Sequence, residues 1–85
     1  MNNDLFFSYN CKTGNILWND RSVVRFDSYS GGIYFWIKDR GVKRFLVQTE
    51  LVELSKTIKW LIEQHGCDFG EEMRRAAYSY LTNAA

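Results

Sequence analysis

The hydrophobic periodicity of this chain of 85 residues changes near Thr49, and that change sets the order of its elements. Before Thr49, apolar residues form short runs separated by Gly, Asn and Asp, a pattern typical of β-strands joined by turns. After Thr49, Leu51, Leu54, Ile58 and Leu61 recur at the spacing of one face of a helix. Strands first and helices last is the pattern of the α+β class.

The N-terminal half predicts an antiparallel β-meander of about four or five strands. Turn-forming residues over 10–15 indicate a first hairpin. A second hairpin is expected around Asp39, Arg40 and Gly41, because Gly41 can adopt the positive φ that such turns require. The expected strands cover residues 5–9, 16–18, 23–26, 33–37 and 45–47.

The C-terminal half predicts two helices. We expect Thr49 to cap a first helix that ends at His65, where Gly66 supplies the stop. A second helix is expected from Asp68 to about Leu81, since Asp68 and Glu71 have the spacing of a capping box. The first helix should pack across one face of the sheet. A chain this short supports one core, so we expect residues 1–85 to form a single α+β domain.

Charge and hydropathy argue against several classes of protein. The net charge is +1, from 11 basic and 10 acidic side chains, which gives no overall attraction for a polyanion. The apolar run over residues 33–37 is far shorter than the roughly 20 residues that span a bilayer, and the first residues lack the pattern of a signal peptide. We therefore expect a cytoplasmic protein with no membrane partner.

The cysteine and histidine content points away from catalysis. Cys11 and Cys67 are interpreted as free thiols of a reducing compartment, with one bridge between them as the alternative. The single histidine, His65, has Cys67 and Asp68 nearby, but a metal site needs three or four converging ligands and a nucleophilic thiol needs a positioned base. We predict no catalytic residue, no metal and no cofactor, and hence no enzyme.

The segment Cys-Lys-Thr-Gly-Asn-Ile-Leu-Trp, residues 11–18, resembles the turn and strand that open some phage HNH-type endonucleases. In that family a Thr-Gly turn leads into a Leu-x-Trp strand. The family's activity requires at least two histidines around a bound metal, and this chain has only His65. The resemblance therefore implies no endonuclease activity here.

A basic and aromatic cluster on the second hairpin is the candidate contact surface. Tyr34, Trp36 and Lys38 alternate with Ile33, Phe35 and Ile37, so the strand is apolar on both faces. Such a strand is central in its sheet, or its second face meets a partner. The predicted partner-binding residues are Tyr34, Trp36, Lys38, Arg40, Lys43 and Arg44.

Two classes of binding function fit this cluster. The preferred hypothesis is a small non-catalytic module that binds a protein through aromatic and arginine anchors. The alternative is a single-stranded nucleic-acid or RNA-binding protein that uses hairpin 34–45, with phosphates on the cations and bases on the rings. A homodimer is a further arrangement that the sequence leaves open. By size and composition the chain is also typical of a phage or mobile-element inhibitor or adaptor that binds a host complex.

Overall fold

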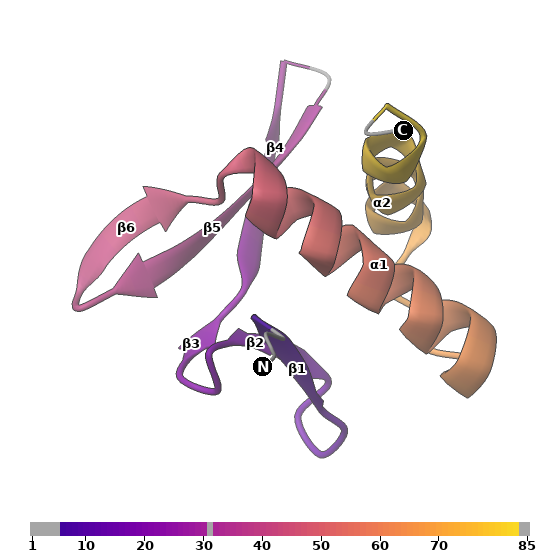
Figure 1. Cartoon of the computed structure of the whole chain (residues 1–85), viewed down its shortest axis with the longest axis horizontal. Coiled ribbons are helices and arrows are strands. Elements are labelled where there is room, and N and C mark those ends of the chain that lie inside the picture. The colour runs from indigo at the N-terminus through magenta and orange to yellow at the C-terminus, as the bar shows by residue number, and fades with distance from the viewer. Residues whose placement is uncertain (1–5, 31, 84–85) are drawn as a thin grey trace.

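The computed structural model of the chain describes residues 6–30 and 32–83, and in these it shows six strands followed by two helices (Figure 1). One antiparallel sheet has the order β1-β2-β3 and the other has the order β4-β5-β6. The strands are β1 (Phe7–Asn10), β2 (Asn15–Trp18), β3 (Ser22–Val23), β4 (Arg25–Tyr29), β5 (Gly32–Asp39) and β6 (Val42–Phe45). The helices are α1 (Gln48–His65) and α2 (Glu71–Asn83). The predicted α+β class and element order are confirmed.

The predicted single meander is wrong, because the strands form two sheets that separate at Val24. Residues 23–26 were expected to form one strand. Instead, Val23 pairs with Leu17 of β2, and the Val24 N–H donates to the Ile16 carbonyl at 2.8 Å. Arg25 then pairs with Trp36 of β5. The backbone on the two sides of Val24 thus serves different sheets, which the run of apolar residues could not reveal.

The β5–β6 hairpin turns through Arg40 and Gly41, as the sequence indicates. Both residues have positive φ, 55° and 81°, which is the conformation of a two-residue type I′ turn. The turn sets the register, with Asp39 opposite Val42 and Trp36 opposite Phe45. β6 ends at Phe45, although the Leu46 N–H still donates to the Phe35 carbonyl at 3.1 Å.

Both helices begin at positions other than those predicted. α1 has Val47 and not Thr49 as its N-cap, and Glu50 Oε1 accepts the Val47 N–H at 3.0 Å, as the third helical residue does in a capping box. α2 begins at Glu71, because Asp68 Oδ1 accepts the Gly70 N–H in a local turn instead of capping a helix. Gly66 ends α1 at φ 67°, as predicted.

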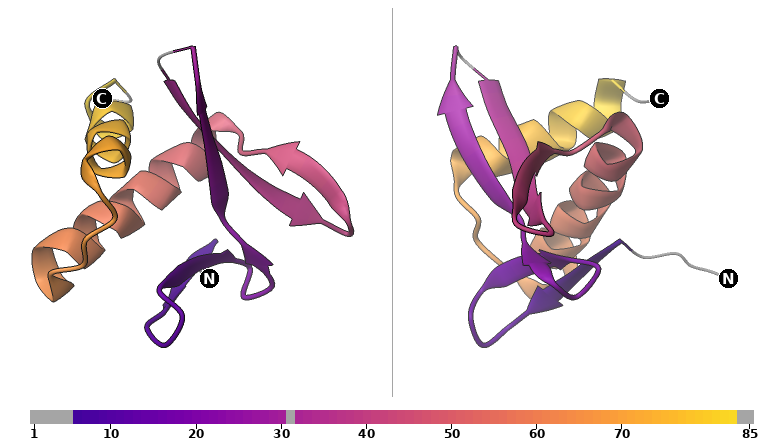
Figure 2. Two further views of the ribbon diagram at one scale, coloured as in Figure 1. Left: turned by 180° about the vertical axis from the view of Figure 1, so that it is seen from behind. Right: turned by 90° about the vertical axis from the view of Figure 1, so that its left-hand side faces the viewer.

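The core lies where α1 meets both sheets. α1 packs along α2 and contacts β1, while α2 contacts β5, and the views show α1 running beside both sheets (Figures 1 and 2). The buried apolar side chains form one cluster, composed of Phe7, Ile16, Trp18, Phe35, Ile37, Leu46, Leu54, Ile58, Leu61 and Ala77. The predicted stripe of α1 therefore faces the core. In the described residues, no helix is both long and apolar enough to cross a membrane.

The buried stripe of α1 gives a stability prediction. Leu61→Ala should lower the free energy of unfolding by about 2–5 kcal/mol, because Leu61 is 2% exposed and its removal leaves a cavity in the core. Urea or thermal denaturation followed by circular dichroism measures this loss. Gln64→Ala, at an exposed position of the same helix, should change stability little. Equal effects of the two substitutions would contradict the assigned core.

Candidate binding face

The alternation of β5 divides the β4–β5–β6 sheet into two unlike faces. Phe35 and Ile37 are buried against the core. Tyr34, Trp36 and Lys38 point the opposite way, and the register adds Phe45 opposite Trp36 and Lys43 opposite Lys38. We call this surface the outer face; it consists of Tyr34, Trp36, Lys38, Lys43 and Phe45, with Arg25 and Asp27 beside them on β4.

Aromatic rings gather at the centre of the outer face. Tyr34 and Phe45 are 40% and 47% exposed, and their rings meet edge to face with centroids 6.5 Å apart. Trp36 lies beside them and is half-buried, with no hydrogen-bond acceptor for its buried Nε1 among the described residues. The three rings therefore form one aromatic cluster, of which Tyr34 and Phe45 are the more exposed members.

Lys43 contacts both the aromatic rings and a neighbouring carboxylate. Its Nζ lies 4.4 Å from the centroid of Trp36 and 5.5 Å from that of Phe45, within the range of cation–π attraction. The same atom is 3.2 Å from Asp27 Oδ2. Both partners of this ion pair are nearly half exposed, so the pair contributes little to stability, and a charged ligand could replace Asp27.

Arg44 lies apart from the other predicted residues. It is on the face of β6 that carries Ile37 on β5, and its two terminal nitrogens donate to the two oxygens of Glu50 at 2.9 and 3.0 Å. Its guanidinium carbon is also 5.2 Å from the centroid of Trp18. The hydrogen bonds from Arg44 hold the pKa of the Glu50 carboxyl below its ordinary value, with a smaller contribution from the Val47 N–H. Arg44 therefore links β6 to the first turn of α1 and to Trp18 of β2, and it is not part of the outer face.

The remaining predicted residues lie near the end of the hairpin. Lys38 is exposed on the outer face, and Arg40 is exposed in the turn. The structure thus brings Tyr34, Trp36, Lys38 and Lys43 onto one face and puts Arg40 at its border. Phe45 and Asp27 were missed. The register of a two-residue turn at Arg40 and Gly41 would have placed Phe45 opposite Trp36, whereas Asp27 could not be placed without the pairing of β4.

The described residues offer no candidate metal centre, and the histidine and cysteines lie away from the outer face. Residues 6–30 and 32–83 contain no group of three metal-ligating side chains. His65 is exposed and rests edge to face on Trp60, with ring centroids 4.6 Å apart. Cys11 and Cys67 are both free thiols, so the alternative of a bridge is not seen.

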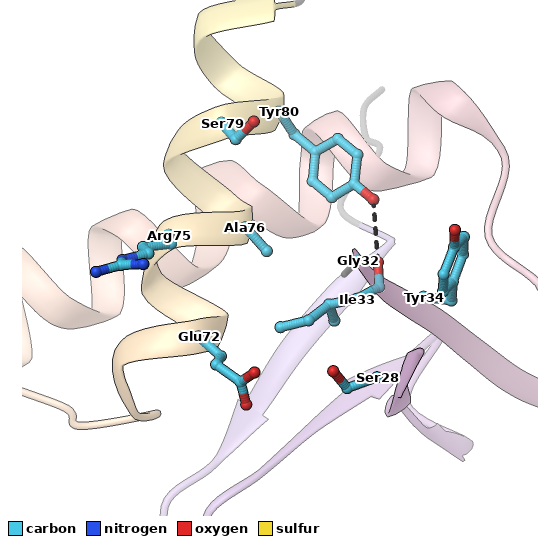
Figure 3. A pocket seen from close by; sticks show the side chains of 9 residues that line it. All are labelled: Ser28, Gly32, Ile33, Tyr34, Glu72, Arg75, Ala76, Ser79 and Tyr80. Atoms are coloured by element: carbon cyan, nitrogen blue, oxygen red, sulfur yellow. Dashed lines mark hydrogen bonds between the residues drawn. The ribbon is translucent and has the colours of Figure 1, made fainter. Parts of the chain in front are cut away.

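A groove separates α2 from the end of the β4–β5 hairpin (Figure 3). It has a volume of about 450 Å³ and is open to solvent. The Tyr80 hydroxyl donates to the Ile33 carbonyl at 3.3 Å, which ties α2 to β5, and burial raises the pKa of Tyr80. Arg75, at the border of the groove, points away from it and donates from Nε to Glu71 at 3.1 Å. The groove thus lies between α2 and β5, which the Tyr80 hydrogen bond links.

No protein-family model, curated protein or solved structure matches this chain.

The Arg44–Glu50 pair predicts how stability depends on pH. The pKa of Glu50 is lowered from an ordinary value of 4.5, so the pair stabilises the fold above that pH and its contribution is lost as pH falls through the lower, folded value. Glu50→Gln should be less stable than wild type near neutral pH, by about 1–3 kcal/mol, because the bonds from Arg44 lose their charge assistance. The difference should shrink below about pH 4.

Urea denaturation across pH 2–7 measures this dependence. Glu71→Gln is the matched control, because both ion pairs of Glu71 are exposed. It should follow the wild-type pH profile closely. A Glu50→Gln profile that runs parallel to wild type over the whole range would contradict the assigned role of the pair.

Proposed function

We propose that the chain is a small non-catalytic binding module that contacts a protein partner through the outer face. One observation carries the proposal. On the β4–β5–β6 sheet, the face that carries Phe35 and Ile37 contributes to the core, whereas the other face leaves Tyr34 and Phe45 in contact with solvent around a half-buried Trp36. Exposed rings that cluster at the centre of a surface, with charged residues around them, are the usual anchors of protein interfaces.

The face is suited to binding because its side chains are already positioned. Tyr34 packs on Phe45, and Lys43 lies over Trp36 and Phe45 while it pairs with Asp27. Side chains held in place lose less conformational entropy when a partner binds, and that loss is about 0.5–1.5 kcal/mol for each side chain that must be immobilised. The ring cluster therefore supports binding with little rearrangement.

Single-stranded nucleic acid is the second candidate partner, favoured by the exposed cations Lys38, Arg40 and Lys43 near the rings. Two contacts rank it below a protein. Lys43 lies over the face of Trp36 on which a base would stack, and Asp27 puts a carboxylate where a strand crossing the rings would bring a phosphate.

The proposal keeps the wider hypothesis of a phage or mobile-element inhibitor or adaptor that acts on a host complex. A binding module without catalytic groups acts by occupying a surface or by bringing two proteins together. The hypothesis of source rests on size and composition alone.

Alanine substitutions distinguish the protein from the nucleic-acid partner. Trp36→Ala and Phe45→Ala should each weaken capture of a partner from lysate by about 30-fold, the effect of losing a central aromatic anchor, and Lys43→Ala should weaken it less. Trp60→Ala is the matched control, because Trp60 is an exposed ring on α1 that lies outside the outer face. Capture should survive nuclease treatment. Submicromolar nucleic-acid binding that falls steeply with salt and disappears in Lys43→Ala would reverse the ranking.

The non-catalytic part of the proposal has its own test. The triple variant His65→Gln, Cys11→Ser, Cys67→Ser should retain partner binding within about twofold, because none of these residues is on the outer face. Circular dichroism verifies the fold, and a titration with the captured partner measures the affinity. A folded triple variant that loses its biological activity by orders of magnitude would show that thiol or imidazole chemistry is required.

A further inference from the structure

β6 is the edge strand of the β4–β5–β6 sheet, so one of its two edges has no neighbouring strand among the described residues. In the described residues it pairs with β5 and with no other strand. The β5–β6 hairpin projects from the body of the molecule, and the views from front and back both show β6 at its border (Figures 1 and 2). Its side chains Val42 and Phe45 are 67% and 47% exposed. An exposed edge of this kind is a template for another extended chain.

The register identifies which backbone groups point away from β5. Asp39 and Val42 flank a two-residue turn and so form a hydrogen-bonded pair, and the bond from Leu46 N–H to the Phe35 carbonyl belongs to the same series. Val42 and Arg44 therefore bond inward, to β5. The N–H and C=O groups of Lys43 and Phe45 point outward. Arg44 Nη1 donates a hydrogen bond to the Phe45 carbonyl at 3.2 Å. The Lys43 N–H, the Lys43 C=O and the Phe45 N–H therefore remain for a partner strand.

Charge indicates what kind of chain fits this edge. Lys38, Arg40 and Lys43 are exposed around β6, whereas Arg44 is neutralised by Glu50. Lys43 also pairs with Asp27 of β4, but both side chains of that pair are nearly half exposed, so a carboxylate of an added strand can compete for Lys43. If β6 of a second copy paired antiparallel about Lys43, the two Lys43 side chains would lie opposite each other, and pairing about Arg44 would set each Lys43 against Phe45, so neither register gives Lys43 an acidic neighbour. The homodimer considered from the sequence is therefore disfavoured at this edge.

We propose that the partner adds a β-strand to the free edge of β6, and that the segment it adds is extended and rich in carboxylates. This inference rests on the proposed function, since the added strand lies beside Phe45 at the border of the outer face. Main-chain hydrogen bonds to Lys43 and Phe45 supply register, and Lys38, Arg40 and Lys43 select acidic side chains. A nucleic acid has no backbone groups that could continue the ladder.

A defined peptide tests the inference by NMR. The probe is the capped peptide EVEYEVEV, titrated to about 1 mM into the labelled full chain, the concentration at which weak binding is still visible. The Lys43 and Phe45 amides should shift and become protected from hydrogen exchange. The same peptide with N-methyl groups at alternate residues should bind about tenfold more weakly, because it cannot complete the ladder. The lysine analogue KVKYKVKV should not bind.

A second test changes the edge strand itself and leaves the peptide unchanged. Lys43→Pro removes an outward N–H and leaves the bonds to β5 in place, whereas Lys43→Ala removes only the cation. The proline variant should bind the acidic peptide about tenfold more weakly than the alanine variant. If Lys43→Pro does not fold, the N-methylated peptide carries the test alone.

Several results would overturn strand addition. These are equal binding of the methylated peptide, unprotected Lys43 and Phe45 amides in the bound state, equal binding of the lysine peptide, or no binding at about 1 mM. Shifts of the Tyr34, Trp36 and Phe45 rings without edge protection would reject strand addition and leave the outer face as the binding surface. Binding of a thymidine oligonucleotide that shifts the rings and not the edge amides would reject both, in favour of nucleic acid.

Discussion

The bidentate ion pair between Arg44 and Glu50 links the β4–β5–β6 sheet, the start of α1 and Trp18 of the β1–β2–β3 sheet. Arg44 comes from β6, Glu50 comes from the first turn of α1, and the same guanidinium lies against Trp18 of β2. Glu50 also accepts the Val47 N–H at the start of α1. A planar guanidinium that meets a carboxylate with two parallel bonds fixes both distance and orientation. One pair of side chains thus sets where the helix begins and how it approaches the sheet.

The position of the outer face follows from this arrangement. With α1 fixed by Glu50 and packed through Leu54 and Ile58, one side of β5 is committed to the core. Alternation along the strand then directs Tyr34 and Trp36 away from it. The exposed rings of the outer face and the edge of β6 that no described strand pairs with are adjacent features of the same hairpin, and together they form the surface proposed to contact the partner.

Patterns among residues close in sequence were enough to predict the helix α1 and the turn between β5 and β6. Helical spacing of Leu54, Ile58 and Leu61 located α1, and Gly41 located the hairpin turn. Long-range pairing was not accessible. The division into two sheets depends on the Val24 N–H bonding to Ile16 while Arg25 pairs with Trp36, and nothing local in the sequence distinguishes this from one continuous strand. For the same reason Arg44 was grouped with Lys43, although adjacent residues of a strand face opposite ways. Glu50, which pairs with Arg44, lies on a different element.

The central claim is that the outer face of the β4–β5–β6 sheet contacts the partner, and hydroxyl-radical footprinting of the captured complex tests it most directly. The account predicts that the side chains of Tyr34, Trp36 and Phe45 lose labelling when the partner is bound, while Trp60 on α1 is labelled as in the free chain. Unchanged labelling of the three outer-face rings in the complex, with protection of Trp60 or of Tyr80 on α2 instead, would contradict it.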